Sequence, residues 1–276
     1  MSGQVSFVGA GPGAADLLTL RGAQRIAVAD IVIWAASLVH EDVLGHARPD
    51  ALVVNSAEHS VEGITPHYER AAREGLRVAR IHSGDPALWG AVQEQLELCR
   101  VLGLATEVVP GVSSFTAVAA IVQRELTVPE VAQSVVLTRL EGGKTPMPSR
   151  ESVRAFAAHG TTMALFLSAA RTRQLQDELL AGGAYDADTP CVVAYAATWP
   201  EELVFECRLA ELAARVREHR LYRHTLVLVG PALGAGGTRS HLYHPGHFHE
   251  HRRVESPAAR AALRARDRTL VDGGRP

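Results

Sequence analysis

The sequence predicts an α/β protein built from two α/β domains, each with its own largely parallel or mixed sheet. Short segments rich in Val and Ile alternate with amphipathic segments, which is the βαβ pattern of a mostly parallel sheet. The alternation pauses after Pro110-Gly111 and then resumes with longer, more charged connections. The length of 276 residues is sufficient for about two domains of ~100–200 residues each. We therefore expect an N-terminal domain over residues 1–115 and a C-terminal domain over residues 116–236.

The N-terminal domain is expected to alternate strands and helices. One helix is predicted over residues 17–29. A second is predicted over residues 66–74, with Thr65 as its N-cap, Pro66 as its first residue and Gly75 just beyond its end. The strands are predicted at residues 5–8, 31–34, 51–54, 78–82 and 106–109.

The C-terminal domain begins with an apolar helix predicted over residues 113–123. The strand-like spacing then resumes, but the two domains are too long to be strict repeats of each other and no internal period is found. The strands are predicted at residues 134–138, 162–167, 191–196 and 225–229.

The last stretch, residues 237–276, is expected to be a flexible tail rich in His and Arg. Five of the chain's 13 histidines fall between positions 241 and 251, a density that could bind a divalent metal. The flanking Pro245, Gly246 and Arg252 favour a mobile, solvated segment instead. No metal site is predicted.

Composition disfavours several classes of protein. A net charge of −2 gives no indication of a nucleic-acid partner. No apolar run reaches the ~18–20 residues that span a bilayer, and no charged leader precedes the first strand, so a cytoplasmic location is expected. Lys144 is the only lysine and lies in a Gly/Pro-rich loop, which disfavours Schiff-base chemistry. Cys99, Cys191 and Cys207 are far apart in sequence, so neither a disulfide framework nor a zinc knuckle is expected.

A glycine-rich loop, Gly9-Ala10-Gly11-Pro12-Gly13-Ala14, follows the first predicted strand. It satisfies a loose dinucleotide-binding pattern, which makes a nicotinamide-dependent oxidoreductase one alternative. Pro12 lacks an N–H where a pyrophosphate needs a donor. The second strand ends in Trp34-Ala35-Ala36, without the acidic residue that binds a ribose. On its own, the loop indicates only a tight strand-to-helix turn.

Two further motifs follow later strands. Ser83-Gly84-Asp85-Pro86 follows the fourth strand, and Pro110-Gly111-Val112-Ser113-Ser114 follows the fifth. With the glycine-rich loop, they lie at the carboxyl ends of predicted parallel strands, where open α/β sheets bind ligands. In this order and spacing, the three motifs resemble the tetrapyrrole methylase family, whose members use S-adenosyl-L-methionine to methylate corrin and sirohaem precursors.

Other segments resemble one branch of that family, which methylates precorrin-4 at C-11 in cobalamin biosynthesis. The uroporphyrinogen-methylating branch carries a Tyr-Asp-Arg-Leu-Val segment whose acid is absent here, so no role can be carried over from it. Methylation of another position of a precorrin or uroporphyrinogen ring is the alternative, and the presence of cobalt in the ring is open. The segments that resemble the C-11 branch are residues 34–39, 137–142, 145–148 and 197–202.

The resemblance implies a cleft between the two domains that holds S-adenosyl-L-methionine beside a tetrapyrrole, in a protein that relatives suggest is a homodimer. An adenosyl sulfonium needs apolar walls for its adenine and polar backbone groups for its edge. On this resemblance, the donor is expected to contact Pro12, Gly84, Asp85, Leu88, Ser113, Ser114, Leu167, Ala197 and Thr225.

Several of these residues also have a purely structural interpretation. Asp85 could cap a helix that begins at Pro86, and the Ser113-Ser114 pair is also typical of a helix start. By periodicity alone, Leu167 and Ala197 would be ordinary core residues.

A precorrin carries acetate and propionate groups, so cations are expected around the ring. Arg139, Lys144 and Arg171 lie in or beside predicted strand-end loops and are the candidates, although each could equally be solvated surface charge. Arg139 is preferred because it lies within a branch-specific segment.

No catalytic residue is assigned from the sequence. The ring nitrogens of a tetrapyrrole can supply electrons to the methylated carbon, so a strong base is not required. Four residues could accept the departing proton and cannot be ranked: Glu58, His59, Glu141 and Tyr195.

Overall fold

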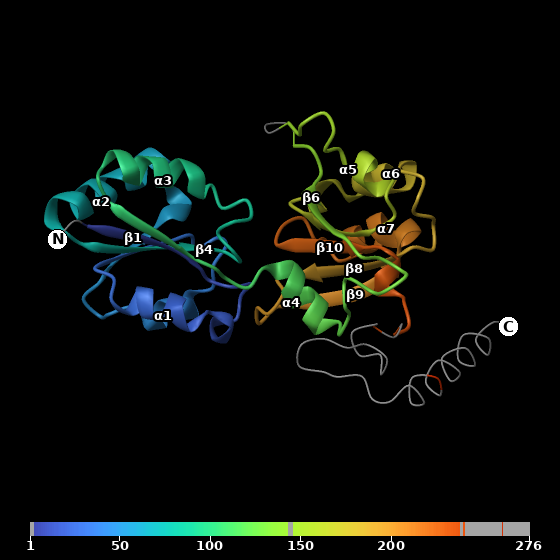
Figure 1. The fold of residues 1–276 in the computed structure, drawn as a ribbon, viewed down its shortest axis with the longest axis horizontal. Helices are drawn as coiled ribbons and strands as arrows, with labels where there is room; N and C mark the ends of the chain where they lie inside the picture. Colours follow the sequence, from blue (N-terminus) through green and yellow to red (C-terminus); the bar gives the residue numbers. More distant parts are fainter. Residues whose placement is uncertain (1–2, 143–145, 238–239, 241–260, 262–276) are drawn as a thin grey trace.

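The chain forms two α/β domains that lie side by side in a computed structural model (Figure 1). The structure describes residues 3–142, 146–237, 240 and 261. Lys144 and nearly all of the expected tail therefore lie outside the described residues. No helix in the described part of the chain is long and apolar enough to cross a bilayer.

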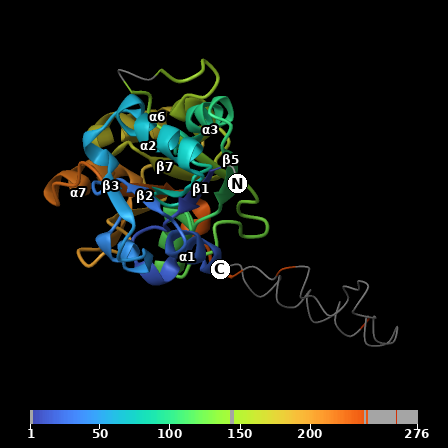
Figure 2. The ribbon, with the colours of Figure 1, turned by 90° about the vertical axis from the view of Figure 1, so that its left-hand side faces the viewer.

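The N-terminal domain contains a parallel sheet with the strand order β3-β2-β4-β1-β5. Its central strands are apolar on both faces because helices cover both sides of the sheet. Helices α2 (Val61–Glu74) and α3 (Val92–Val101) pack on one face, and α1 (Leu20–Ala27) on the other (Figure 2). The strands are β1 (Gln4–Gly9), β2 (Ile31–Trp34), β3 (Leu52–Asn55), β4 (Arg77–His82) and β5 (Ala105–Val109).

The predicted start of α2 is wrong. The helix begins at Val61 after Ser60, so Pro66 lies inside it rather than at its first position. Pro66 removes one backbone donor within the helix. The hydroxyl of Thr65, the expected N-cap, instead donates to the carbonyl oxygen of Val61 at 2.8 Å. The predicted end is confirmed, because Gly75 is the C-cap and has φ +70°.

The C-terminal domain contains a mixed sheet with the strand order β6-β7-β10-β8-β9. Strands β6 and β7 are parallel, and the other neighbours are antiparallel. Helices α5 (Val153–Ala157), α6 (Thr172–Ala181) and α7 (Leu212–Glu218) pack on one face of the sheet. The strands are β6 (Val135–Arg139), β7 (Thr162–Phe166), β8 (Pro190–Tyr195), β9 (Leu203–Arg208) and β10 (Thr225–Val229).

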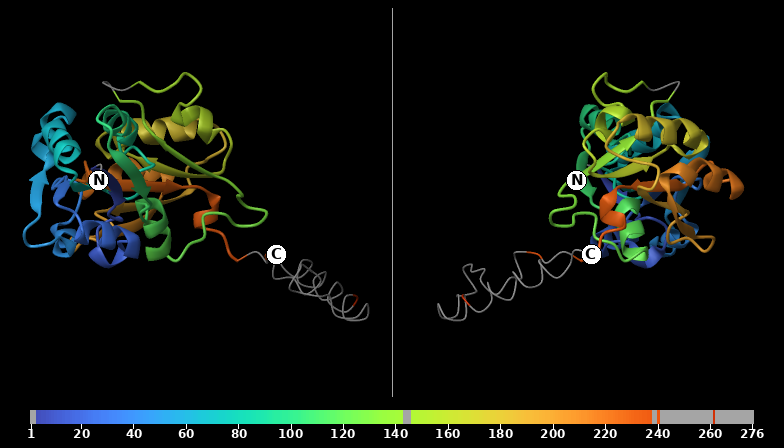
Figure 3. Two further views of the ribbon diagram at one scale, coloured as in Figure 1. Left: turned by 60° about the vertical axis from the view of Figure 1, so that its left-hand side comes forward. Right: turned by 90° about the vertical axis from the view of Figure 1, so that its right-hand side faces the viewer.

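Helix α4 (Ser114–Ile121) connects the domains and packs on the opposite face of the second sheet from α6 (Figure 3). Its small residues Ala117 and Ala119 allow close packing, and Val118 is fully buried against the sheet. The helix that follows β5 therefore packs as part of the C-terminal domain. This places the end of β5 directly at the junction between the domains.

Strand β9 was not predicted from the sequence. Its six residues, Leu203–Arg208, form an edge strand that pairs antiparallel with β8. Most of its side chains are partly buried, so the segment lacks the strong apolar pattern of the central strands. The segment between β8 and β9 is consequently the loop of a hairpin, with its turn at the domain junction.

Candidate functional site

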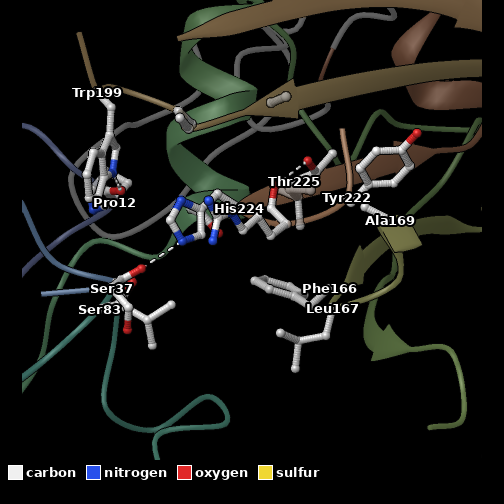
Figure 4. Close-up of a pocket in the computed structure, with 17 residues that line it drawn as sticks. Pro12, Ser37, Ser83, Phe166, Leu167, Ala169, Trp199, Tyr222, His224 and Thr225 are labelled. Carbon is white, nitrogen blue, oxygen red and sulfur yellow. Dashed lines mark hydrogen bonds between the residues drawn. The ribbon is translucent and has the colours of Figure 1, made fainter. Parts of the chain in front are cut away.

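A cavity of about 480 Å³ lies at the junction between the two domains (Figure 4). The carboxyl ends of N-terminal strands provide one side of it, as expected for an open parallel sheet. The ends of β7 and β8 and the start of β10 provide the other side. The wall is largely apolar and is formed by Pro12, Ser37, Leu38, Ser83, Ser114, Phe166, Leu167, Ala169, Ala194, Ala196, Ala197, Trp199, Tyr222, Arg223, His224, Thr225 and Leu226.

On the N-terminal side, the loops after β1, β4 and β5 pack backbone against backbone. The Gly84 N–H donates to the Gly11 carbonyl oxygen at 2.8 Å, and the Gly11 N–H donates to the Gly84 carbonyl oxygen at 3.2 Å. A Cβ atom on Gly111 would lie 2.1 Å from the carbonyl oxygen of Gly84. Glycine is therefore required at position 111 for this close approach.

On the C-terminal side, the loop between β8 and β9 reaches across to the glycine-rich loop. The indole N–H of Trp199 donates to the Pro12 carbonyl oxygen at 2.9 Å. The hydroxyl oxygen of Thr198 accepts a hydrogen bond from the Ala14 N–H at 2.9 Å. A Cβ atom on Gly13 would lie 2.1 Å from Cδ1 of Trp199, so only glycine lets the ring lie this close. These contacts hold the two walls of the cavity together.

A third contact between the domains involves His224, directly before β10. Its Nε2 lies 2.7 Å from the carbonyl oxygen of Ser37, so this nitrogen carries the proton of the hydrogen bond (Figure 4). The imidazole also lies beside the Trp199 ring, with 5.8 Å between the ring centroids. Trp199 in turn makes an edge-on contact with His40. One rim of the cavity is therefore a group of aromatic rings from both domains.

A second cavity, of about 390 Å³, adjoins the first and shares Leu38, Ser83, Ser114, Phe166 and Leu167 with it. It extends over the loop after β4. The Trp89 and Phe166 rings, one from each domain, lie 4.7 Å apart there. The two cavities together provide room for two ligand groups that meet at the shared residues.

The backbone around these cavities is strained. Five non-glycine residues with positive φ line one cavity or the other: Trp89, Ala91, Leu167, Ala196 and His224. Such conformations each cost about 1–3 kcal/mol and cluster at ligand-binding sites. In addition, large apolar side chains are exposed here, including Leu167 at 73% and Tyr222 at 57%. Exposed apolar surface of this kind in a concave site indicates a ligand with apolar parts.

All nine residues predicted to contact the methyl donor lie at these two cavities. Their part in donor binding stays a prediction. Pro12, Ala197 and Thr225 line the first cavity; Gly84, Asp85, Leu88 and Ser113 line the second; Ser114 and Leu167 line both.

The interpretation of Leu167 as an ordinary core residue is wrong. This residue follows β7 directly with φ +51°, which turns its side chain out of the sheet and into the crevice. Ala197, by contrast, is 7% exposed and packs with the core beneath the cavity wall.

The carboxylate of Asp85 organises two loops. Its Oδ1 accepts a hydrogen bond from the Ala87 N–H at 2.8 Å, and its Oδ2 accepts one from the Gly111 N–H at 3.1 Å. Residues 86–89 form a turn rather than a helix. The expectation that Asp85 caps a helix is therefore wrong, because it caps a turn. Asp85 stabilises that turn and joins it to the loop after β5. Ser113 is the N-cap of α4, but no side-chain hydrogen bond caps the helix there.

Arg80 and His82 are charged or titratable residues at the second cavity that were missed from the sequence. The guanidinium of Arg80 donates to Gln95 Oε1 at 3.0 Å and to Ser56 Oγ at 2.8 Å, both neutral groups. Burial lowers the pKa of Arg80, although an arginine remains protonated. Burial also lowers the pKa of His82 to about 3, with the Arg80 charge acting in the same direction.

The three predicted substrate cations are not gathered at the cavities. Arg139 and Arg171 line neither of them, and Lys144 lies outside the described residues. The guanidinium of Arg171 donates to the backbone carbonyl of Glu141 and to Gln174 Oε1, so it supports the loop after β6. A role of these residues in substrate binding stays a prediction.

The candidate proton acceptors also lie away from the cavity walls. Glu58, His59 and Glu141 line neither cavity, and Tyr195 lines a neighbouring groove with Arg220. Among the described residues, no group of three or more His, Cys, Asp or Glu side chains is placed to bind a metal.

The other missed site residues are mostly in C-terminal loops. The hairpin loop was missed because β9 was not predicted, although residues 197–202 had been singled out as a branch-specific segment. The conformation of His224 could not be anticipated, because positive φ in a histidine has no sequence signature. The missed residues of the first cavity include Ser37, Leu38, Ser83, Phe166, Trp199, Tyr222, Arg223 and His224.

The fold and the site together define a two-domain α/β enzyme whose ligand cavity lies between its sheets. Residues 4–213 match the family model of the Tetrapyrrole (Corrin/Porphyrin) Methylases. The chain belongs to this family and is a methyltransferase. This match gives no support to the oxidoreductase alternative.

Curated relatives and solved structures agree. A precorrin-4 C(11)-methyltransferase from Sinorhizobium sp. is 43% identical over 88% of this chain and 96% of its own length. A cobalt-precorrin-4 C(11)-methyltransferase from Methanocaldococcus jannaschii is 39% identical over 91% of this chain and 96% of its own. The X-ray structure of a cobalt precorrin-4 methyltransferase has a TM-score of 0.80 at 39% identity, covering 83% of this chain and 95% of that one.

A more distant neighbour was solved with a ligand. The uroporphyrin-III C-methyl transferase from Thermus thermophilus, in complex with S-adenosyl homocysteine, has a TM-score of 0.70 at 29% identity. The alignment covers 84% of this chain and 99% of that one.

Proposed function

We propose that this protein transfers a methyl group from S-adenosyl-L-methionine to C-11 of precorrin-4, or of its cobalt form, in cobalamin biosynthesis. The observation that carries the proposal is similarity over nearly the whole chain, at 39–43% identity, to relatives with that name. The junction cavity supports it because two of the segments that resemble the C-11 branch, residues 34–39 and 197–202, contribute residues to its wall.

The first cavity fits an adenosyl group. Its volume of about 480 Å³ falls in the ~300–1,000 Å³ range of small-molecule sites. Ala194, Ala196 and Leu226 offer apolar surface for an adenine, and Leu167 and His224, both with positive φ, line the same cavity. The donor supplies a methyl group activated on a sulfonium.

The residues of this chain position the two reactants and exclude water from the reacting groups. The hydrogen bonds of Trp199 and Thr198 to the glycine-rich loop fix the distance between the two walls. Orientation of this kind accounts for up to ~7–11 kcal/mol of a barrier when two reactants are held in line. The apolar Leu38, Phe166 and Leu167, where the two cavities meet, would keep water from a reactive sulfonium.

The second cavity is the proposed place of the macrocycle edge. The Trp89 and Phe166 rings, tilted by 41° to each other, offer aromatic surface, and the guanidinium of Arg80 offers a cation held by hydrogen bonds to the neutral Gln95 and Ser56. Arg223 lines the first cavity and the neighbouring groove and could pair with a second carboxylate. Arg139, Lys144 and Arg171 remain candidates for carboxylates farther out on the ring.

Turnover tests the proposed position. The protein would be incubated with donor carrying a ¹³C-labelled methyl group and with precorrin-4 or its cobalt form, and the label located by NMR. We expect label at C-11. Label at C-1 or C-17 would favour methylation of another ring position and reject the C-11 assignment.

Binding tests the class of cofactor. Calorimetry with S-adenosylhomocysteine and with NADH should give a saturable isotherm for the thioether alone. Binding of NADH without binding of the thioether would revive the oxidoreductase alternative.

The family resemblance also predicts a homodimer, and the sequence features described above predict a cytoplasmic location. Light scattering coupled to gel filtration should give twice the chain mass of 29.5 kDa. A monomer mass at working concentration would reject the dimer.

A further inference from the structure

Two of the three cysteines lie opposite each other in the second sheet. Cys191 on β8 and Cys207 on β9 are paired in the antiparallel register. Directly opposed residues in antiparallel strands have Cα atoms about 4.5–5.5 Å apart. This separation lies within the ~4.4–6.8 Å range that a disulfide bridges. The sequence did not predict this pairing, because 15 residues separate the two cysteines and β9 was not expected.

The two side chains point to the same face of the sheet. Cys191 is fully buried in the core beneath α6 and α7, and Cys207 is partly buried against the same core. The Cys191 thiol donates to the carbonyl oxygen of Thr189 at 3.8 Å. The interaction between the two neighbouring thiols raises the pKa of Cys191 and lowers the pKa of Cys207. Cys207 also lines a surface cavity together with Arg208 and Glu211, so a small reagent can reach it. A thiol with a lowered pKa and solvent access is the reactive member of such a pair.

We propose that Cys191 and Cys207 form a redox modification site, a dithiol that hydrogen peroxide converts to an intramolecular disulfide. The Cys207 thiolate attacks a peroxide oxygen, which breaks the O–O bond and gives a sulfenic acid and hydroxide. The Cys191 sulfur then displaces hydroxide from the Cys207 sulfur, which forms the S–S bond. The two thiol protons leave with the two hydroxides as water, and the peroxide takes up the two electrons.

The bond would close a ring that contains one wall of the junction cavity. Residues 191–207 comprise most of β8, the hairpin loop and most of β9. The loop includes Ala197, Thr198 and Trp199, which contact the cavity or the glycine-rich loop. A disulfide between β8 and β9 at the open end of the hairpin would limit the separation of β9 from β8. Oxidation is therefore expected to stabilise the C-terminal domain and to leave the cavity residues in place.

The test treats the folded, full-length protein with hydrogen peroxide, blocks remaining thiols under denaturing conditions, and maps the peptides without reduction. We expect one linked pair of peptides containing Cys191 and Cys207, lighter by two hydrogens than the unlinked pair and separated by dithiothreitol. Cys99 should be recovered alkylated, because it lies on the buried face of α3 in the core of the N-terminal domain.

Matched variants locate the effect. Oxidation should raise the thermal midpoint of the wild-type protein and of Cys99→Ser, and leave that of Cys207→Ser unchanged. Cys207 is only partly buried, so the serine variant is expected to fold; Cys207→Ala serves the same purpose.

Other products would overturn the proposal. Recovery of Cys191 and Cys207 as alkylated thiols after peroxide treatment would show that the pair does not react. A sulfinic acid at Cys207 with unlinked Cys191, or a disulfide between two chains, would show that the second step fails. None of these readouts depends on methyl transfer, so they are independent of the proposed function.

Discussion

At the scale of single residues, the cavity depends on glycines that let the backbones of neighbouring loops pack directly against each other. Gly111 is the clearest case, because its Cα faces the backbone of both Gly9 and Gly84. The Pro-Gly sequence predicted a turn at this point, but the need for glycine itself follows only from the three loops being packed together. That packing joins strands that are distant in the sequence.

Gly111→Ala tests this packing. The added methyl would meet the Gly84 carbonyl oxygen at 2.1 Å, so we expect a loss of about 1–3 kcal/mol in the free energy of unfolding. Affinity for S-adenosylhomocysteine should also fall, because the loop after β4 must move. Gly45→Ala is the matched control, since its added methyl would have no atom of the described residues within 4 Å apart from those adjacent in the chain. Equal stability of the two variants in urea unfolding would contradict the account.

Asp85→Ala removes the acceptor for two backbone donors, at Ala87 and Gly111. A net hydrogen bond contributes about 0.5–1.5 kcal/mol, so we expect a folded protein with modestly reduced stability. Calorimetry should show binding of S-adenosylhomocysteine weakened about tenfold, or ~1.4 kcal/mol, because both loops border the second cavity. Unchanged affinity would mean that Asp85 serves only the local turn.

The buried His82 predicts a pH dependence of stability. Its folded-state pKa of about 3 lies below its unfolded value near 6.5, so the unfolded chain binds more protons between these pH values. His82 therefore lowers the free energy of unfolding as pH falls through this window, by up to ~1.4 kcal/mol per unit. None of the residues that the structure describes hydrogen-bonds to its Nε2, so His82→Phe should unfold less readily than wild type at pH 5. A stability difference between the two proteins that is the same at pH 7 and pH 5 would contradict this.

At the scale of elements, the β8–β9 hairpin determines how the domains meet. The strong apolar strands β1, β2, β4, β7, β8 and β10 were all predicted, because buried strands have a continuous Val/Ile/Leu pattern. The edge strand β9 was missed since its side chains are only partly buried and carry Glu and Arg. The start of α2 was misplaced because proline is most common in a first turn, whereas Pro66 occurs in the second.

The hairpin loop can be tested through its two hydrogen bonds to the N-terminal domain. Trp199→Phe removes the donor to Pro12, and Thr198→Val removes the acceptor for Ala14. Each should weaken S-adenosylhomocysteine binding about fivefold, or ~1 kcal/mol, because the cavity wall loses its anchor. Thr198→Ser keeps the hydroxyl and is the matched control. Wild-type affinity in both Trp199→Phe and Thr198→Val would show that the loop is not needed for the cavity.

At the scale of the whole molecule, the cavity exists because two sheets present their strand ends to each other. The three motifs at strand ends predicted that a ligand binds at the N-terminal half of this wall, and the family resemblance supplied the contact residues. The C-terminal half followed only from the family resemblance, because Leu167, Ala197 and Thr225 have no local signature of a binding residue. The predicted cations Arg139 and Arg171 were drawn from loops near strand ends, and the structure instead places Arg80 and Arg223 at the cavities.

The central claim is that this junction binds the methyl donor. A crystal structure of the protein with S-adenosylhomocysteine tests it most directly. Density for the adenosyl group should lie between the glycine-rich loop and the wall formed by Ala197 and Thr225, with the sulfur directed toward the second cavity. An empty junction in crystals of a protein saturated with the thioether, or a ligand bound on another surface, would contradict the account.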